Sequence, residues 1–219
     1  MSWIQKLKNL ALEILFPIPE LPDGLRLFDT LFCSVCRARQ PNNIKICHKN
    51  SQYKLGAAIS YNDDAVRKMI WRLKYRGRTG YAPILAQLLE KYLDNLNLKL
   101  GTYTVVPIPL SKKRLGERGY NQAAIIAKLV ASRFRLSFEG GALIRVKDTK
   151  AQMEVKSWDD RKTNIAGCFG ITDASLVNKK NIILIDDVFT SGSTISEAIR
   201  TLRLAGANKI LALTVAKAG

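Results

Sequence analysis

The sequence predicts an α/β protein: a parallel β-sheet flanked by helices, with a small zinc-ribbon-like segment near the N-terminus. Short apolar runs alternate with segments whose apolar residues recur at spacings of three and four, and this spacing is typical of helices. The apolar runs are uninterrupted, as expected for strands covered on both faces. Three of the four cysteines lie together at Cys33, Cys36 and Cys47, which indicates the small segment.

Composition favours a globular protein with anionic partners. The chain has 219 residues, of which 47% are hydrophobic, and a formal net charge of +17. Such an excess favours nucleic acid, phosphorylated small molecules or an anionic membrane surface. No apolar run approaches the length of about 18 residues that a membrane-spanning helix needs, so no transmembrane segment is predicted.

Residues 1–30 are predicted to form an amphipathic helix and a linker. The apolar positions of the helix fall on one stripe, made of Trp3, Ile4, Leu7, Leu10, Ala11, Ile14 and Leu15. This stripe packs either on the protein's own core or on a membrane or partner, and Lys6 and Lys8 would suit the second alternative.

Residues 31–52 form the cysteine-bearing segment. No export signal is evident, so clustered cysteines indicate metal ligands rather than disulfides. The spacing nearly matches the four-cysteine ribbon C-x2-C-x10-C-x2-C, but Asn50 stands at the fourth position. We therefore expect Zn²⁺ on Cys33, Cys36, Cys47 and His48, or else a ribbon that has lost its metal and is held by packing. Cys168 lies in an apolar context and is expected in the core.

Residues 53–219 are predicted to form the main domain, with alternating strands and helices. A strand at 54–61 precedes helices at 63–75 and 82–96, and a strand at 102–109 precedes a helix at 121–134. Strands at 141–146 and 165–171 bracket a polar stretch. The last elements are a strand at 181–186, a helix at 193–206 that Gly206 ends, and a strand at 209–216.

The stretch "IILIDDVFTSGST" (182–194) carries the clearest chemistry. Its apolar residues form a buried strand that brings Asp186 and Asp187 to the ligand-binding edge of the sheet. Residues 190–194 are all Thr, Ser or Gly and lead into a helix, where backbone N–H groups and hydroxyls suit a phosphate. Carboxylates accept hydrogen bonds from vicinal hydroxyls. The combination is complementary to a ribose 5-phosphate.

Other motifs are absent from the sequence. The chain has no Gly-Lys dipeptide and no G-x-G-x-x-G, which excludes a P-loop and a dinucleotide fingerprint. Its single histidine, His48, lies in the cysteine segment, which argues against a Ser-His-Asp triad.

The stretch 182–194 resembles the phosphoribosyl-pyrophosphate (PRPP) signature of the type I phosphoribosyltransferases. "LKYRGR" (73–78), "VPIPLSKKRLGERGYNQA" (106–123) and a spaced set of single residues further resemble the ComF family of competence-associated phosphoribosyltransferase-like proteins. That spaced set is Arg145, Thr149, Gln152, Arg161, Asn164 and Gly167. The resemblance covers nearly the whole chain from about residue 30 and implies a type I phosphoribosyltransferase-like fold.

The resemblance also implies site residues. Asp186 and Asp187 would bind the ribose hydroxyls, and the 5-phosphate would lie on Thr190, Ser191, Gly192, Ser193 and Thr194. The pyrophosphate loop would contain Pro109, Leu110, Ser111 and Lys112, where the family usually has His in place of Ser111. Arg114 and Arg118 are candidates to neutralise pyrophosphate, or else belong to a solvated basic loop.

Residues 147–161 occupy the position of the loop that closes over PRPP in type I enzymes. Arg145, Gln152 and Arg161 are its candidate functional residues, and catalytic roles are implied for Asp186, Asp187 and Arg161. The implied reaction displaces pyrophosphate at ribose C1 with Mg²⁺ as cofactor, mainly through positioning and electrostatic stabilisation. The sequence identifies no acceptor.

A basic segment with interspersed aromatics runs from residue 67 to residue 78. Aromatic rings among cations suit single-stranded nucleic acid, because bases stack and phosphates pair. The alternative is a helix with its aromatics in the core and its cations in solvent. The candidate nucleic-acid residues are Arg67, Lys68, Trp71, Arg72, Lys74, Tyr75, Arg76 and Arg78.

Three functions follow as hypotheses. The first is a phosphoribosyltransferase that binds PRPP and acts in uptake of single-stranded DNA during natural transformation, in the cytoplasm or peripherally with DNA-uptake machinery at the inner face of the membrane. The second is a catalytically inactive PRPP-sensing protein of DNA uptake. The third is a transcriptional regulator, but no helix-turn-helix is evident.

Overall fold

A computed structural model describes residues 21–40, 48, 53–147 and 166–219. Its main sheet has seven strands in the order β2-β1-β3-β9-β8-β4-β5. The strands from β3 to β5 pair in parallel, whereas β1 and β2 add an antiparallel edge. The predicted fold class, a mostly parallel sheet flanked by helices, is confirmed.

The strands of the main sheet are short at its edges and long at its centre. They are β1 (Leu31–Cys33), β2 (Arg39–Gln40), β3 (Lys54–Ser60), β4 (Tyr103–Pro107), β5 (Ser137–Phe138), β8 (Asn181–Phe189) and β9 (Ile210–Lys217). A separate antiparallel pair is made of β6 (Leu143–Arg145) and β7 (Phe169–Ile171).

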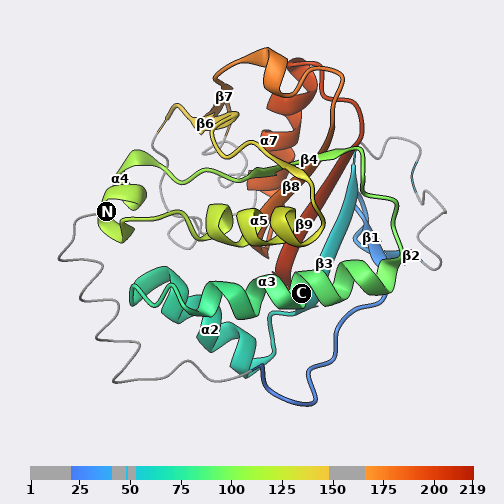
Figure 1. The fold of residues 1–219 in the computed structure, drawn as a ribbon, viewed down its shortest axis with the longest axis vertical. Helices are drawn as coiled ribbons and strands as arrows, with labels where there is room; N and C mark the ends of the chain where they lie inside the picture. The colour runs from blue at the N-terminus through green and yellow to red at the C-terminus, as the bar shows by residue number, and fades with distance from the viewer. Residues whose placement is uncertain (1–20, 41–47, 49–52, 148–165) are drawn as a thin grey trace.

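The described helices are distributed over both faces of the sheet. They are α2 (Asp64–Tyr75), α3 (Tyr81–Leu96), α4 (Lys112–Arg118), α5 (Gln122–Arg133), α7 (Ser193–Leu204) and a short 3-10 turn at Ala174–Leu176. Figure 1 shows α3 and α5 running side by side across one face. Asp63 and Asn121 begin α2 and α5 by accepting hydrogen bonds from the backbone N–H of Val66 and Ala123.

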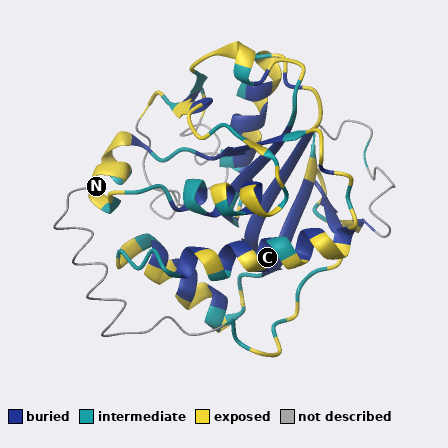
Figure 2. Cartoon of the chain, in the orientation of Figure 1, coloured by how far each residue is buried: buried dark blue, intermediate teal, exposed yellow. Residues whose placement is uncertain are grey.

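Alternating residues of β8 divide the interior into two apolar layers. Ile183 and Ile185 pack with α2, α3 and α5, whereas Ile182 and Leu184 pack with the apolar face of α7. This alternation follows from the two-residue period of a strand, and it explains why residues 182–185 of β8 are all apolar. Figure 2 shows the result, with the central strands buried and α4 largely exposed.

The structure differs from the sequence prediction at several elements. The strand predicted at 181–186 continues as β8 to Phe189, so both acidic residues lie within it. Residues 112–118, expected as part of a loop, form α4. The predicted N-terminal helix and the stretch 148–165 lie outside the described residues. In the part of the chain that the structure describes, no helix has the length and apolarity needed to cross a membrane.

Candidate functional site

Asp187 is the centre of a buried polar cluster on β8. Its side chain is 5% exposed, and its Oδ1 lies 2.8 Å from Lys74 Nζ on α2. Its Oδ2 accepts a hydrogen bond of 2.8 Å from Gln122 Nε2 at the start of α5. Two helices that cover the same face of the sheet therefore fix the orientation of one carboxylate.

Lys74 serves as the counter-ion of this carboxylate. Burial alone would lower the pKa of Lys74, but the charge and hydrogen bond of Asp187 raise it above its ordinary value. The ammonium group therefore stays charged at neutral pH. Buried ion pairs of this kind depend on both partners, since removal of one leaves an uncompensated charge.

Asp186 has a different environment from its neighbour. Its Oδ1 accepts a hydrogen bond of 2.8 Å from the backbone N–H of Asp187. Burial and the charge of Asp187 raise the pKa of Asp186 to about 7, although the charges of Lys74 and Arg145 oppose the shift. We call Asp186 and Asp187 the acid pair. Near neutral pH the Asp186 member of the acid pair therefore exchanges its proton.

The raised pKa of Asp186 predicts a pH-dependent stability. The folded protein binds the proton of Asp186 up to about pH 7, whereas the ordinary pKa is 3.8, so the contribution of this group to stability falls as the pH rises between these values. We expect wild type to lose on the order of 2–4 kcal/mol more than Asp186→Asn between pH 4 and pH 8. Urea unfolding at both pH values measures the difference. Identical pH profiles for the two proteins would contradict a raised pKa.

The hydroxyl loop, residues 190–194, follows β8 and includes the first two residues of α7. Gly192 has φ +80°, and a Cβ at this position would lie 2.8 Å from Phe189 Cζ. Both its left-handed backbone and its lack of space therefore require glycine. Gly192 is the N-cap of α7, a helix of 12 residues. Because glycine has no side chain, it makes no side-chain hydrogen bond to the backbone N–H groups of the first turn.

The serines of the hydroxyl loop contact each other. Ser191 Oγ and Ser193 Oγ lie 2.6 Å apart, and Ser196 N donates to Gly192 O at 2.8 Å to begin the helix. The carbonyl of Ser191 accepts a hydrogen bond from Arg37, which lies far away in the sequence. The loop is therefore held both by its own hydroxyls and by the cysteine-bearing segment.

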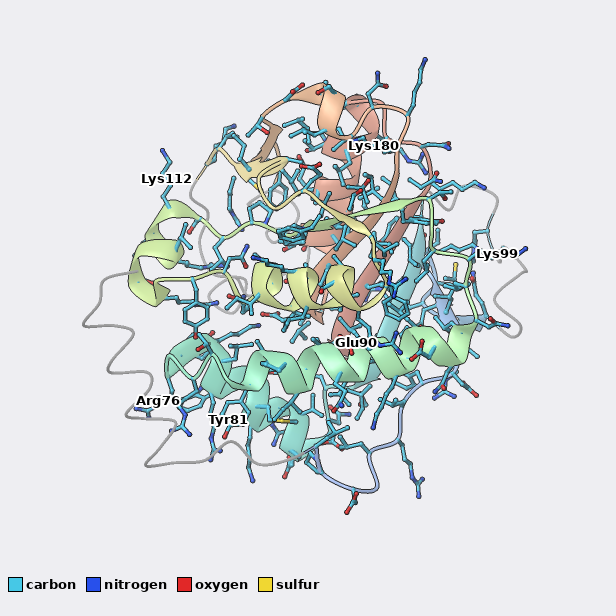
Figure 3. The ribbon with its side chains drawn as sticks, in the orientation of Figure 1. Arg76, Tyr81, Glu90, Lys99, Lys112 and Lys180 are labelled. Atoms are coloured by element: carbon cyan, nitrogen blue, oxygen red, sulfur yellow. The ribbon has the colours of Figure 1, made fainter. Side chains whose placement is uncertain are left out.

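The predicted pyrophosphate loop lies at the same sheet edge as the acid pair. Ile108 N donates to Ile185 O at 2.8 Å, which places the end of β4 beside the residue that precedes Asp186. Pro109 and Leu110 follow, half-buried, and Ser111 is buried as the N-cap of α4, where its Oγ accepts from Arg114 N at 3.3 Å. Lys112 is exposed on α4 (Figure 3).

The candidate arginines occupy different positions. Arg118 Nη1 donates to Gln122 Oε1 at 3.0 Å. Because Gln122 also donates to Asp187, it connects Arg118 to the acid pair. Arg145 stacks on Phe169 at 5.5 Å and is near enough to lower the pKa of Asp186. Arg114 is half-buried on α4. Gln152 and Arg161 lie outside the described residues.

Two exposed aromatic rings and two guanidinium groups lie together beside this site. Trp71 and Tyr75 are 45% and 54% exposed, with ring centroids 6.1 Å apart. Arg76 lies over Trp71 at 5.0 Å, and Arg118 lies over Tyr75 at 5.1 Å. We call these four residues the aromatic–cation face. The alternative expectation, that the two aromatics belong to the core, is wrong.

The other predicted nucleic-acid residues differ in exposure. Arg67 and Lys68 are exposed, and Arg67 pairs with Asp64. Arg72 donates to Tyr81 Oη at 2.6 Å, and Arg78 is half-buried. Lys74 requires correction: its ammonium faces Asp187 inside the protein, because the turn of α2 that exposes Trp71 and Tyr75 directs Lys74 toward β8.

The cysteine segment contains a cluster of potential metal ligands. The ligand atoms of Cys33, Cys36 and His48 all lie within 4.8 Å of one another, and Cys33 Sγ is 3.4 Å from His48 Nδ1. Burial would raise the pKa of the Cys33 thiol, but hydrogen bonds from the backbone of Cys36 and Val35 and from His48 lower it to about 6. Two sulfurs and one imidazole at this separation fit Zn²⁺. Cys47 lies outside the described residues, whereas Cys168 is buried as expected.

Sequence reasoning missed three residues of the site. Gln122, Arg37 and the role of Lys74 all depend on contacts between segments far apart in the chain, with separations of 65 residues for Gln122–Asp187 and 154 for Arg37–Ser191. Both Lys74 and Gln122 lie in stretches that carry the family resemblance, so that resemblance was the available signal.

Curated proteins similar to this chain include competence proteins. It is 29% identical to the competence protein ComFC of Bacillus subtilis over 176 residues, which are 78% of this chain and 64% of that protein. It is 28% identical to the competence protein F of Haemophilus influenzae, covering 68% and 67% of the two chains. The DNA utilization protein YhgH of Salmonella typhimurium is 27% identical, covering 80% and 85%. The resemblance to the ComF family is thus confirmed, and the match spans about two thirds of the first two relatives.

Solved structures similar to this chain include phosphoribosyltransferases. The adenine phosphoribosyl transferase of Trypanosoma brucei has a TM-score of 0.44 at 10% identity, covering 76% of this chain and 84% of that one. The glutamine PRPP amidotransferase of B. subtilis has a TM-score of 0.38 at 17% identity, covering 63% and 26%. No family model matches the chain.

Proposed function

We propose that this homologue of ComFC, competence protein F and YhgH binds PRPP at the edge of its parallel sheet and handles single-stranded DNA on the adjacent aromatic–cation face. The observation that carries the proposal is the juxtaposition of the acid pair with the hydroxyl loop at the carboxyl ends of parallel strands. The names of its relatives, competence and DNA utilization proteins, support a role in DNA uptake.

In this proposal the acid pair accepts hydrogen bonds from the ribose hydroxyls. Asp187 already receives Lys74 and Gln122, but a carboxylate offers about four lone-pair sites, so the ribose adds to these partners without displacing them. Asp186, with its pKa of about 7, accepts such bonds better as the pH rises above neutrality. The 5-phosphate lies on the backbone N–H groups at the start of α7.

We expect Mg²⁺ to bind at this site through the oxygens of pyrophosphate and not through the carboxylate of Asp187. The ammonium of Lys74 lies 2.8 Å from Asp187 Oδ1 and repels a second cation there. Mg²⁺ takes oxygen ligands and commonly binds through substrate phosphates. When bound, it would neutralise charge on the leaving pyrophosphate. Arg145 and Arg118 supply additional positive charge near the acid pair.

The geometry accommodates both an enzyme and a binding protein. In the enzyme, an acceptor displaces pyrophosphate from ribose C1, and the chain contributes orientation and electrostatic stabilisation. In the binding protein, PRPP alters DNA handling without turnover. Pure protein incubated with PRPP and Mg²⁺, with and without single-stranded DNA, distinguishes them: pyrophosphate released in proportion to time supports the enzyme, and PRPP recovered intact supports the binding protein.

The aromatic–cation face is expected to bind single strands without sequence preference. Trp71→Ala should weaken binding of an oligonucleotide by about 1–3 kcal/mol, because a base loses its stacking partner, and should affect duplex much less. Arg76→Glu should weaken the binding of single strands and of duplex, and should reduce the salt dependence of the affinity. Fluorescence anisotropy at two salt concentrations measures these effects.

Lys99→Glu is the matched control for Arg76→Glu. Both substitutions change the net charge equally, but Figure 3 shows Lys99 at the opposite end of the molecule from Arg76. Arg72 is a poorer choice because its hydrogen bond to Tyr81 couples it to folding. Equal loss of affinity in Lys99→Glu and Arg76→Glu would assign binding to net charge alone and remove the aromatic–cation face from the proposal.

A further inference from the structure

Arg37 connects the cysteine segment to the hydroxyl loop. It follows Cys36 directly, and its backbone N donates to Cys33 O at 2.9 Å, which closes a turn around residues 33–36. We call this turn the cysteine knuckle. Cys33 N in turn donates to Ala38 O at 2.9 Å, so the knuckle joins β1 to β2. Arg37 has φ +62°, a conformation that few residues other than glycine adopt unless their surroundings impose it.

The side chain of Arg37 reaches the loop proposed to hold phosphate. Its guanidinium donates a hydrogen bond to Ser191 O and lies 5.2 Å from the ring centroid of Phe189. Phe189 is 1% exposed and is also the ring that leaves no space for a side chain at Gly192. The guanidinium of Arg37 therefore contacts the hydroxyl loop in two ways. It binds a backbone carbonyl of the loop, and it lies beside the ring on which Gly192 packs.

The direction of Arg37 depends on the knuckle. Cys33 and Cys36 flank the turn, and their sulfurs lie with His48 in the metal-ligand cluster. Coordination of both cysteines to one ion would fix the separation of their sulfurs, and with it the knuckle and the backbone of the next residue. Without a metal, the left-handed conformation of Arg37 loses that support.

We propose that Arg37 is a positioning residue that links Zn²⁺ binding at the cysteine knuckle to phosphate binding at the hydroxyl loop. Zn²⁺ on Cys33, Cys36 and His48 holds the guanidinium against Ser191 O, and the hydroxyl loop keeps the geometry that receives a phosphate dianion. By linkage, phosphate bound at the loop also strengthens retention of the metal. The phosphate half of this link rests on the proposed function, whereas the metal half does not.

The first test needs no phosphate ligand. Amide NMR signals of residues 191–194 should shift when Zn²⁺ is added to metal-free wild type, although the metal binds elsewhere. Arg37→Gln should bind Zn²⁺ but lose most of that shift. Arg39→Gln is the matched control, because Arg39 lies on the same hairpin and stacks on Phe28 rather than on the loop. A shift of equal size in wild type and Arg37→Gln, no shift in wild type, or no Zn²⁺ bound would each overturn the proposal.

The second test measures PRPP affinity with and without Zn²⁺, in Mg²⁺ buffer, by calorimetry. Metal removal should weaken binding about tenfold in wild type, as expected for loss of one hydrogen bond from a charged group, and should have no further effect in Arg37→Gln. Arg37→Lys, which keeps the charge but loses the planar donor, serves if Arg37→Gln unfolds. Equal weakening in wild type and variant would overturn the link. Absence of PRPP binding in Zn²⁺-loaded wild type would defeat the proposed function and the phosphate half, while the NMR result still decides the metal half.

Discussion

Replacing both Asp186 and Asp187 with Asn will weaken PRPP binding by about two orders of magnitude or more. Each carboxylate contributes charge-assisted hydrogen bonds of about 1.5–3 kcal/mol, so the double substitution removes about 3–6 kcal/mol, a loss of roughly a hundredfold or more in affinity. Calorimetric titration with PRPP and Mg²⁺ measures it. Asp64→Asn, at an exposed position of α2, is the matched control and should bind as wild type does.

A folding defect needs to be separated from a binding defect in this experiment. Asp187→Asn leaves Lys74 without its counter-ion, so Lys74→Met belongs in the same background to restore the balance of buried charge. A triple variant that folds cooperatively yet binds PRPP with wild-type affinity would exclude the acid pair from the ribose site.

Lys74→Met alone is expected to cost about 3–5 kcal/mol of stability, because it leaves Asp187 buried with Gln122 as its remaining side-chain partner. Combining it with Asp187→Asn should recover most of this loss, since neither buried charge then remains. Urea unfolding of wild type, both single variants and the double variant measures the coupling free energy.

Arg67→Met is the matched control for Lys74→Met. Arg67 lies on the same helix, but its pair with Asp64 is exposed on both sides, at 48% and 68%, and should contribute less than about 1 kcal/mol. Equal destabilisation by the two substitutions, or additive effects of Lys74→Met and Asp187→Asn, would contradict the buried pair.

Helix α2 serves both parts of the proposed function. It places Lys74 against Asp187 inside the protein, while Trp71 and the adjacent Tyr75 remain on the surface. Arg118 extends the connection, because it contacts the ring of Tyr75 and also Gln122, the second partner of Asp187. A single strand bound on the aromatic–cation face, as proposed, would therefore lie next to the residues proposed to hold ribose.

The long elements were predictable because their signals are local. The apolar run of β8, the periodicity of α3 and the glycine of the hydroxyl loop each reflect constraints within a few residues. Helix α4 was missed because "KKRLGER" contains one apolar residue and buries none, so it has no amphipathic pattern. Strand β5 is two residues long, too short for any pattern.

The residue types of the candidate site could be read from the sequence, but their pairing could not. Adjacent acids before a Ser/Thr/Gly turn predict a ribose phosphate site, and this assignment stays a prediction. Which cation neutralises Asp187 depends on how α2 crosses β8, and no local pattern records this. Lys74 was therefore grouped with the exposed cations around it, although its ammonium faces the interior.

The most direct test of PRPP recognition is a crystal structure of the protein soaked with PRPP and Mg²⁺ above pH 7, where Asp186 is ionised. The proposal predicts the ribose hydroxyls within hydrogen-bond distance of Asp186 and Asp187, and the 5-phosphate against the backbone N–H groups of residues 190–194. PRPP bound at another surface, or a site without ligand at millimolar PRPP, would contradict it.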